Sequence, residues 1–133
     1  GEDRSMADVR EVKRVLLVDD IVEIRYLMRM LLANVRGCQV VAEAANGVEA
    51  VELAERVQPD IVVLDVQMPL LDGFAALPRI LEAAPRAKVV VYSSAEPMRE
   101  AEALRLGAFR YVQKGTDPTL VVDAVRDAAA DRD

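Results

Sequence analysis

The sequence contains no histidine, no tryptophan and only one cysteine, Cys38, among its 133 residues. The absence of histidine excludes every metal centre or catalytic site that needs an imidazole. A single cysteine cannot form a disulfide within the chain, and we expect Cys38 to be a small buried apolar residue. The chemistry of this chain must therefore come from other side chains.

Positive charge is also scarce, since 17 Lys and Arg residues face 23 Asp and Glu residues and leave a net charge of −6. Such an acidic chain repels a phosphate backbone, so we do not expect it to bind nucleic acid directly. The longest apolar runs, at residues 61–64 and 89–92, are too short to cross a bilayer. The polar residues 1–14 lack the apolar region of a signal peptide, so we expect a cytoplasmic protein without membrane contact.

The composition, with 53% apolar and 30% charged residues, is typical of a soluble globular protein. A chain of this length fits one domain. Because the first methionine is Met6, we expect residues 1–12 to be a cloning remnant and leader. Residues 13–130 would then form the domain, and residues 131–133 a frayed tail.

Short runs of β-branched residues alternate, from Arg14 onward, with longer stretches whose apolar residues recur every three or four positions. The alternation is typical of repeated βα units and predicts an α/β fold with a doubly wound parallel sheet. The strand candidates are nearly continuous in apolar character, as strands covered on both faces are. They span residues 15–18, 39–42, 61–64, 89–92 and 109–112.

Five helices are expected between and after these strands. The first carries an apolar stripe of Ile21, Ile24, Met28, Leu31 and Val35. The second begins at Asn46, whose spacing to Glu49 resembles a capping box, and the third spans residues 72–84 with Pro78 inside it. The fourth, residues 97–106, has only a weak apolar stripe. Asp117 as cap and Pro118 in the first turn start the fifth, which runs to residue 130.

Four of the strand candidates end in polar residues: Asp19 and Asp20 after the first, Asp65 after the third, Ser93 after the fourth and Lys114 after the fifth. Ligands of open parallel sheets bind beyond the carboxyl ends of the strands. Carboxylates gathered there repel one another unless a cation neutralises them, and oxygen ligands favour Mg²⁺. A lysine and a hydroxyl nearby suit an anion, for which a phosphoryl group is the natural candidate.

Each of these residues also has an ordinary structural explanation. Asp19 and Asp20 would cap the following helix, Ser93 would lie in a turn, and Lys114 would be a solvated lysine. Asp65 would be a turn residue, although residues 66–69 offer no helix for it to cap. The functional interpretation therefore rests on the set and not on any single member.

The set lies within segments that resemble the receiver domain of bacterial two-component response regulators. They are Val15-Leu-Leu-Val-Asp19-Asp20, Leu64-Asp65-Val-Gln-Met68-Pro69, Asp72-Gly73 and Gly107-Ala-Phe-Arg-Tyr111-Val-Gln-Lys114. They occur in the family's order and cover nearly the whole chain. The resemblance implies a flavodoxin-like receiver fold, with a five-stranded parallel sheet in the order 2-1-3-4-5.

The resemblance also implies a function and a set of site residues. Asp65 would accept a phosphoryl group from a histidine kinase or phosphotransfer protein, making the chain a phosphorylation-controlled switch and not an enzyme. Mg²⁺ would be bound directly by Asp20, mainly through water by Asp19, and by Asp65 and the backbone carbonyl of Gln67. Lys114 would contact the phosphoryl group.

Two further residues would carry the switch. By resemblance, Ser93 supplies the hydroxyl that moves toward the acyl phosphate, and Tyr111 supplies the ring that then turns inward; the alternative for Tyr111 is partial burial as a strand residue. The fourth helix, fifth strand and fifth helix would form the partner surface. Charges of both signs there predict a homodimer, although they also fit a solvated surface: Arg99, Glu102, Arg105, Arg110, Asp123 and Arg126.

Some features depart from the family pattern or bear on the output. Gly115 follows Lys114 where many members have proline, and Tyr92 replaces the usual aliphatic residue before Ser93, so its hydroxyl needs a partner or water. Residues 115–118 resemble receivers that precede a DNA-binding module, which would make transcription regulation the output; the alternative is a stand-alone receiver.

Other functional classes on the same architecture fit the sequence less well. A phosphatase of the haloacid dehalogenase type needs a second aspartate where Gln67 stands. A flavin carrier needs a phosphate loop rich in Gly, Ser and Thr after the first strand. A receiver that no longer takes phosphate should have lost an acidic residue or the lysine, and all of them are present.

Overall fold

Five parallel strands form one sheet in the computed structural model, which describes residues 12–68, 71–94, 99–115 and 117–131. The strands lie in the order β2-β1-β3-β4-β5, as predicted. Their bounds are β1 Lys13–Val18, β2 Cys38–Ala44, β3 Ile61–Leu64, β4 Lys88–Ser93 and β5 Arg110–Gln113. The predicted strands agree with these to within two residues at each end.

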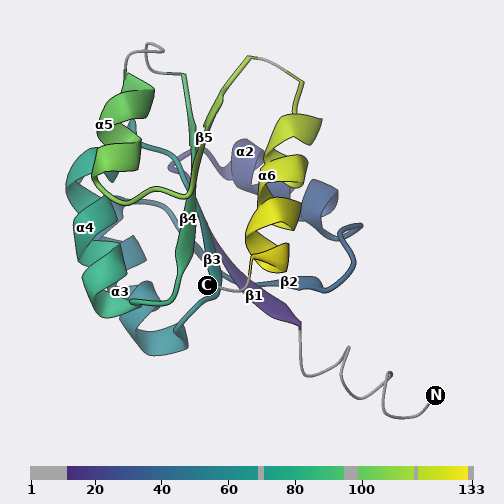
Figure 1. Ribbon diagram of the computed structural model, residues 1–133, viewed down its shortest axis with the longest axis horizontal. Helices are drawn as coiled ribbons and strands as arrows, with labels where there is room; N and C mark the ends of the chain where they lie inside the picture. Colours follow the sequence, from purple (N-terminus) through teal and green to yellow (C-terminus); the bar gives the residue numbers. More distant parts are fainter. Residues whose placement is uncertain (1–11, 69–70, 95–98, 116, 132–133) are drawn as a thin grey trace.

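Helices cover both faces of the sheet (Figure 1). They are α2 Val22–Leu32, α3 Gly47–Val57, α4 Gly73–Ala83, α5 Arg99–Arg105 and α6 Thr119–Ala130. On one side lie α2 and α6, and on the other lie α3, α4 and α5. Every described connection between consecutive strands contains a helix, as parallel pairing requires.

Alternate strand residues build two separate cores. In β1, Val15 and Leu17 pack with α2 and α6, while Leu16 and Val18 pack with the helices on the opposite face. All four of these side chains are buried, because a strand covered on both faces has no solvated side. This double burial explains why the strand candidates read as continuous apolar runs.

Two burial predictions were wrong. Ile21 belongs to the apolar stripe predicted for the first helix, yet its side chain is 46% exposed, because it precedes α2 and does not share the helical face of Met28. Cys38 was expected to be buried but is only partly so, since it starts an edge strand. Burial nevertheless raises the pKa of the Cys38 thiol.

Side-chain caps start two of the helices, α3 and α4. The Asn46 carboxamide oxygen accepts from the backbone N–H of Glu49 at 2.8 Å, and the Glu49 carboxylate accepts from the N–H of Ala45, one residue before the position expected in a capping box. Asp72 accepts from the N–H of Ala75 at 2.9 Å. Asp117 accepts from the N–H of Thr119 at 2.9 Å, but the N-cap residue of α6 is Pro118 and no side chain caps it, so the predicted cap at Asp117 lies one residue before the observed N-cap.

The remaining helix predictions also survive in the described residues. Pro78 lies inside α4 on its exposed side, and the helix continues past it to Ala83. The predicted start of the fourth helix falls outside the described residues. From Arg99 onward, Ala103 is the one buried residue of α5, which agrees with its weak apolar stripe.

Gly73 lets the first turn of α4 touch the backbone that follows β3. A Cβ atom at Gly73 would lie 2.3 Å from the Cα of Val66 and 2.6 Å from the carbonyl oxygen of Asp65. Both obstacles are main-chain atoms, which cannot rotate away as a side chain can. The Gly73 N–H also donates to the Val66 carbonyl at 3.0 Å, so α4 is fastened directly to the segment that carries Asp65.

We predict that Gly73→Ala destabilises the protein by about 1–3 kcal/mol, as overpacking of a tight contact does. Helix propensity alone predicts the opposite sign, a gain of up to about 1 kcal/mol. The free energy of unfolding, measured by urea denaturation, checks this. As a control, Ala75→Gly on the exposed side of the same helix should lose no more than about 1 kcal/mol. An alanine variant at position 73 that is more stable than the parent would contradict the contact.

Candidate functional site

Backbone hydrogen bonds extend one residue beyond the strands and gather the predicted site residues. The N–H of Asp65 donates to the carbonyl of Val18 at 2.9 Å, and the N–H of Lys114 donates to the carbonyl of Ser93 at 2.7 Å. The N–H of Asp19 donates to the carbonyl of Ala44 at 3.1 Å. The sheet itself therefore fixes where the polar side chains stand.

Three carboxylates form a cluster at this edge. One oxygen each of Asp19, Asp20 and Asp65 lies within 4.8 Å of the others. Asp65 is 2% and Asp19 5% exposed, whereas Asp20 is open to solvent. Three hard oxygen donors at this spacing, one of them accessible from solvent, can hold a metal ion.

Lys114 lies against the two buried carboxylates. Its Nζ is 3.1 Å from Asp19 Oδ2 and 3.5 Å from Asp65 Oδ2. Burial by itself would lower the pKa of Lys114, but attraction to Asp65 and Asp19 outweighs burial and raises it. The ammonium group therefore stays charged at neutral pH and partly neutralises the cluster.

The Asp65 carboxylate is held by groups from two directions. The backbone N–H of Gln67 donates to its Oδ1 at 3.0 Å, while Lys114 approaches its other oxygen. Burial raises the pKa of Asp65, and the nearby charge of Asp19 raises it further; the Gln67 N–H and Lys114 oppose both effects. Asp65 is thus the most buried acid of the cluster, and its raised pKa is typical of a functional site.

Helix capping accounts for only part of the Asp19 and Asp20 pair. Asp19 Oδ1 accepts from the N–H of Ile21 at 2.9 Å, so Asp19 does shape the turn that leads into α2. The residue at the N-cap of α2 is Ile21, however, and no side chain caps that helix. Within the described part of the chain Asp20 makes no capping bond, which leaves its carboxylate available at the site.

Ser93 and Tyr111 lie on the two neighbouring strands β4 and β5. The Ser93 side chain is fully buried at the carboxyl end of β4. Tyr111 is partly buried and packs against the core on the α3, α4 and α5 side. In the β4–β5 register Val91 pairs with Tyr111 and Ser93 with Gln113, so the two predicted switch residues are close along the sheet.

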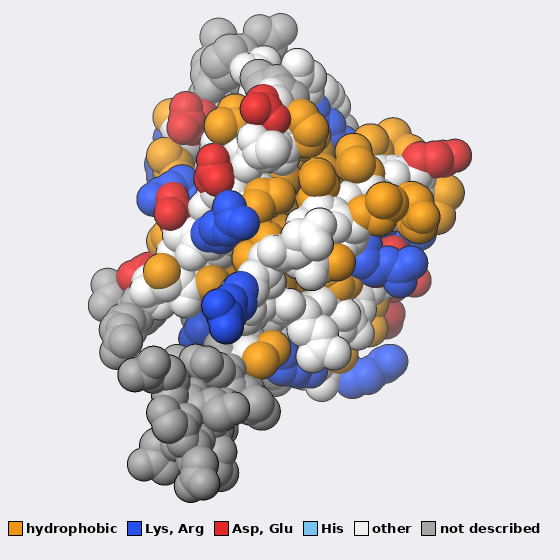
Figure 2. All heavy atoms as spheres, turned by 90° about the vertical axis from the view of Figure 1, so that its right-hand side faces the viewer, with side chains coloured by type: hydrophobic (Ala, Val, Ile, Leu, Met, Phe, Trp, Pro, Cys, Tyr) orange, Lys and Arg blue, Asp and Glu red, His pale blue; other side chains and the backbone are white. Residues whose placement is uncertain are grey.

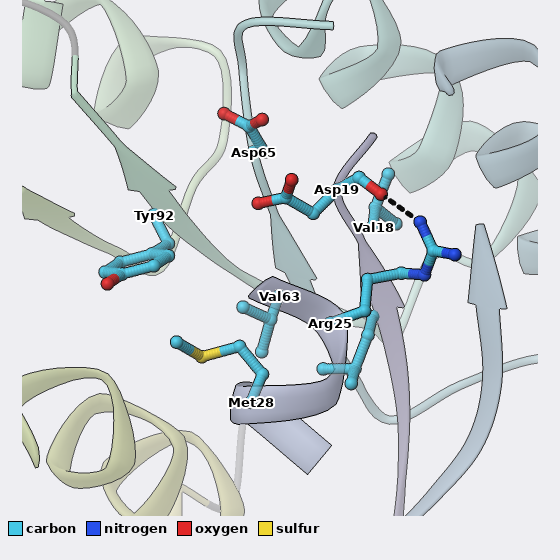
Figure 3. Close-up of a pocket in the computed structure, with 8 residues that line it drawn as sticks. Val18, Asp19, Arg25, Met28, Val63, Asp65 and Tyr92 are labelled. Carbon is cyan, nitrogen blue, oxygen red and sulfur yellow. Dashed lines mark hydrogen bonds between the residues drawn. The ribbon is translucent and has the colours of Figure 1, made fainter. Parts of the chain in front are cut away.

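A pocket beneath the carboxylates is lined by residues from β1, α2, β3 and β4 (Figure 3). Tyr92 forms one wall, opposite Asp19 and above Met28. Its ring is buried, and the Lys114 Nζ lies 5.6 Å from the ring centroid. The unusual phenol noted in the sequence therefore borders the site.

Arg25 also lines this pocket, and sequence reasoning missed it. Its guanidinium donates to the backbone carbonyl of Asp19, as the dashed line in Figure 3 marks. The available signal was a basic residue on the inner half of the first helix, one turn before the buried Met28. Sequence spacing alone does not reveal a contact made to a backbone oxygen.

No helix in the described part of the chain is both long enough and apolar enough to cross a membrane, as the short apolar runs predicted.

Comparison with known proteins places this geometry in a family. Residues 15–126 match the sequence profile described as the response regulator receiver domain. The chemotaxis protein CheY of Thermotoga maritima is 37% identical over 114 residues, which are 85% of this chain and 94% of that protein. A protein-glutamate methylesterase/protein-glutamine glutaminase of Paramagnetospirillum magneticum is 39% identical over 107 residues, or 77% of this chain, but the match spans only 28% of that longer protein.

A solved structure agrees with the fold as well. The crystal structure of the CheX-CheY-BeF₃-Mg²⁺ complex from Borrelia burgdorferi superposes with a TM-score of 0.82, at 29% identity, over 90% of this chain and 90% of that one. The region matched by the sequence profile contains every strand and helix described above except the first residues of β1 and the last residues of α6. The chain therefore belongs to the response regulator receiver domain family, and it is a phosphoacceptor switch of a two-component regulator, not a catalytic enzyme.

Proposed function

We propose that Asp65 is the phosphoacceptor and that the site works with Mg²⁺ held by Asp19, Asp20, Asp65 and the backbone carbonyl of Gln67. The observation that carries the proposal is the approach of three carboxylates at one sheet edge with Lys114 beside them. The donors fit the ion, because Mg²⁺ prefers oxygen ligands and keeps several waters of its own. A bound Mg²⁺ would neutralise negative charge on the transferring phosphoryl group.

The residues of this chain would divide the phosphoryl transfer between them. An Asp65 carboxylate oxygen attacks the phosphorus atom of a phosphohistidine, the phosphorus–nitrogen bond breaks, and the imidazole leaves with the electron pair. The product is an acyl phosphate on Asp65. Lys114, now shared between Asp19 and Asp65, would pair with the new phosphoryl oxygens.

The phosphoryl donor has to lie outside residues 1–133. The chain has no histidine, so it cannot supply the phosphohistidine itself. A histidine kinase or a phosphotransfer protein is the partner that this chemistry requires. The output would be a conformational switch in which Ser93 moves toward the acyl phosphate and Tyr111 follows, supported by the burial of Ser93 and by the pairing of β4 with β5.

Incubation with acetyl phosphate and Mg²⁺, followed by intact-mass measurement, tests the phosphoacceptor. We expect one phosphoryl group on the parent protein and none on Asp65→Asn, because an amide keeps the shape but is not a nucleophile. Asp123→Asn, on the exposed side of α6, is the control and should be phosphorylated like the parent. Equal phosphate incorporation by Asp65→Asn would refute the assignment.

The same variant should not lose stability when metal is absent. Because burial raises the folded-state pKa of Asp65 above its unfolded value, the carboxyl contributes stability at acidic pH and loses it as pH rises through that pKa. The substituted amide carries no charge, so at neutral pH we expect Asp65→Asn to melt a few degrees higher than the metal-free parent. The melting temperature at pH 7 and at pH 4 checks that the difference shrinks in acid.

Lys114→Ala is predicted to separate phosphorylation from its consequence. Asp65 and the acidic ligands remain, so acetyl phosphate should still label the protein, but the direct contact between the phosphoryl group and the residue that follows β5 is then lost, and we expect the conformational response to weaken. Amide hydrogen exchange of β5 and α5, with and without phosphorylation, measures the response. A phosphorylation-dependent exchange pattern like that of the parent would show that Lys114 does not couple phosphorylation of Asp65 to the conformation of β5 and α5.

A homodimer through the α5-β5-α6 face is a further part of the proposal. Several charges on this face already pair within the chain: Arg99 with Glu102, Arg110 with Asp127, and Arg126 with Asp123. These exposed pairs are weak and can exchange partners between two copies. Exposed Arg105, which makes no ion pair among the described residues, is the more informative position.

Light scattering with the phosphoryl mimic BeF₃⁻ and Mg²⁺ checks the dimer. We expect the parent mass to double on activation. Arg105→Glu should remain a monomer at the same protein concentration, because the new negative charge would be repelled by the acidic groups of the second copy that attract Arg105. The control is Arg86→Glu, whose position outside α5, β5 and α6 should leave dimerisation intact. A parent that stays monomeric, or a dimer undisturbed by Arg105→Glu, would rule out this face.

A further inference from the structure

The three carboxylates of the site are not positioned in the same way. Both oxygens of Asp19 are held, by the Ile21 N–H and by Lys114, and both oxygens of Asp65 are held, by the Gln67 N–H and by Lys114. Among the residues that the structure describes, none makes a hydrogen bond or ion pair with the Asp20 carboxylate. Its position therefore depends on the backbone that carries it.

That backbone is held by Arg25. The Arg25 Nη1 donates to the carbonyl oxygen of Asp19 at 2.6 Å (Figure 3). This carbonyl belongs to the planar peptide group that also contains the nitrogen of Asp20, so holding it orients the plane that leads directly into Asp20. The bond is short and charge-assisted, which places it among the stronger hydrogen bonds of proteins.

Arg25 is in turn fixed from a different strand. Its Nε donates to the Glu43 carboxylate on β2 at 3.0 Å, and the Arg25 side chain is only 16% exposed. A planar guanidinium can make both contacts at once because its donors diverge in fixed directions. The contacts run from Glu43 through Arg25 to the peptide between the first two acids of the site.

We propose that Arg25 is a positioning residue for metal binding: it clamps the Asp19–Asp20 peptide so that the otherwise unsupported Asp20 carboxylate faces the other two acids. The inference rests on the Mg²⁺ site of the proposed function. It adds a residue from α2 that does not touch the ion, and it assigns Glu43 on β2 the task of holding that residue.

Two possible roles of Arg25 predict opposite changes in Mg²⁺ affinity when its side chain is removed. If Arg25 acted only as a nearby positive charge, its removal would make the acidic cluster more negative and strengthen the binding of a divalent cation. If it acts as a clamp, its removal lets the peptide reorient and weakens binding. The sign of the change in Mg²⁺ affinity therefore separates the two roles.

Arg29 offers a matched control on the same helix. One turn after Arg25, it pairs with the same Glu43 carboxylate at 3.4 Å, but no described contact joins it to Asp19. Arg29→Met and Arg25→Met each remove one positive charge and one ion pair with Glu43, although the Arg29 pair is longer and more exposed. Only Arg25→Met removes the bond to the Asp19 carbonyl.

Isothermal titration with MgCl₂ at constant ionic strength is the primary test. We expect the Kd for Mg²⁺ to rise about tenfold in Arg25→Met, as for losses of residues that orient metal ligands. Arg29→Met should leave the Kd unchanged or slightly lowered. Arg25→Lys, which keeps one donor able to reach the carbonyl, should recover part of the affinity. A Kd in Arg25→Met equal to or below that of Arg29→Met would overturn the proposal.

A second measurement needs no metal. The amide ¹⁵N resonance of Asp20 reports on the peptide group that Arg25 holds, so it should shift in metal-free Arg25→Met and stay in place in Arg29→Met. An unshifted Asp20 resonance in both variants would refute the clamp. If Arg25→Met does not fold, Arg25→Lys and Glu43→Ala carry both measurements, each expected to change the Kd and the resonance in the same direction to a smaller extent.

Failure of the site and failure of the clamp give different results. Asp20→Ala should abolish the Mg²⁺ titration signal of the parent protein. A parent that does not bind Mg²⁺ would contradict the proposed function, while the Asp20 resonance would still test the clamp. A parent that binds Mg²⁺, with an Arg25→Met variant that binds it equally well, would contradict the clamp alone.

Discussion

Mutual repulsion among Asp19, Asp20 and Asp65 is the constraint to which the rest of the molecule responds. Two of the three acids have almost no solvent to screen them, so the fold has to supply compensating charge and donors. Lys114 supplies the charge, and the N–H groups of Ile21 and Gln67 supply the donors. The three carboxylates nevertheless outnumber the one ammonium group beside them, so the cluster keeps an excess of negative charge that a metal ion could neutralise.

The apolar scaffold beneath the site holds these charged residues in place. Strand β3 is buried along its whole length, and each face of the sheet has its own core. The polar residues begin where the strands end and continue the hydrogen-bond ladder by one residue.

Figure 2 shows the side of the molecule that carries α6 and α2, where hydrophobic side chains gather at the surface and charged groups are scattered around them.

Much of this organisation could be predicted from the sequence, for identifiable physical reasons. Doubly covered strands leave continuous apolar runs, and parallel strands bring their carboxyl ends to one edge, so the cluster of Asp19, Asp65 and Lys114 followed from the spacing of runs and acids. The strand order did not follow from the pattern. It came from the family resemblance, because periodicity says nothing about which strands are neighbours.

The errors and omissions have physical causes as well. Ile21 fitted the helical spacing, but spacing does not reveal where a helix begins. Arg25 escaped notice because one of its partners is a backbone oxygen and the other, Glu43, lies 18 positions away on strand β2. Sequence analysis noted Gly73 only as part of a family motif. The atoms that a larger side chain at this position would strike belong to the backbone of Asp65 and Val66, and sequence spacing does not reveal such a contact.

The contact at Gly73 also bears on which substitutions in α4 leave the site undisturbed. Main chain meets main chain there, with no side chain of α4 standing between that helix and the backbone of Asp65 and Val66. Exposed residues of α4, such as Ala75 and Arg79, can thus be substituted without altering the contact between Gly73 and the backbone of Asp65 and Val66. Substitutions at those exposed positions would change the surface that α4 presents to solvent while the main-chain contact beside Asp65 stays in place.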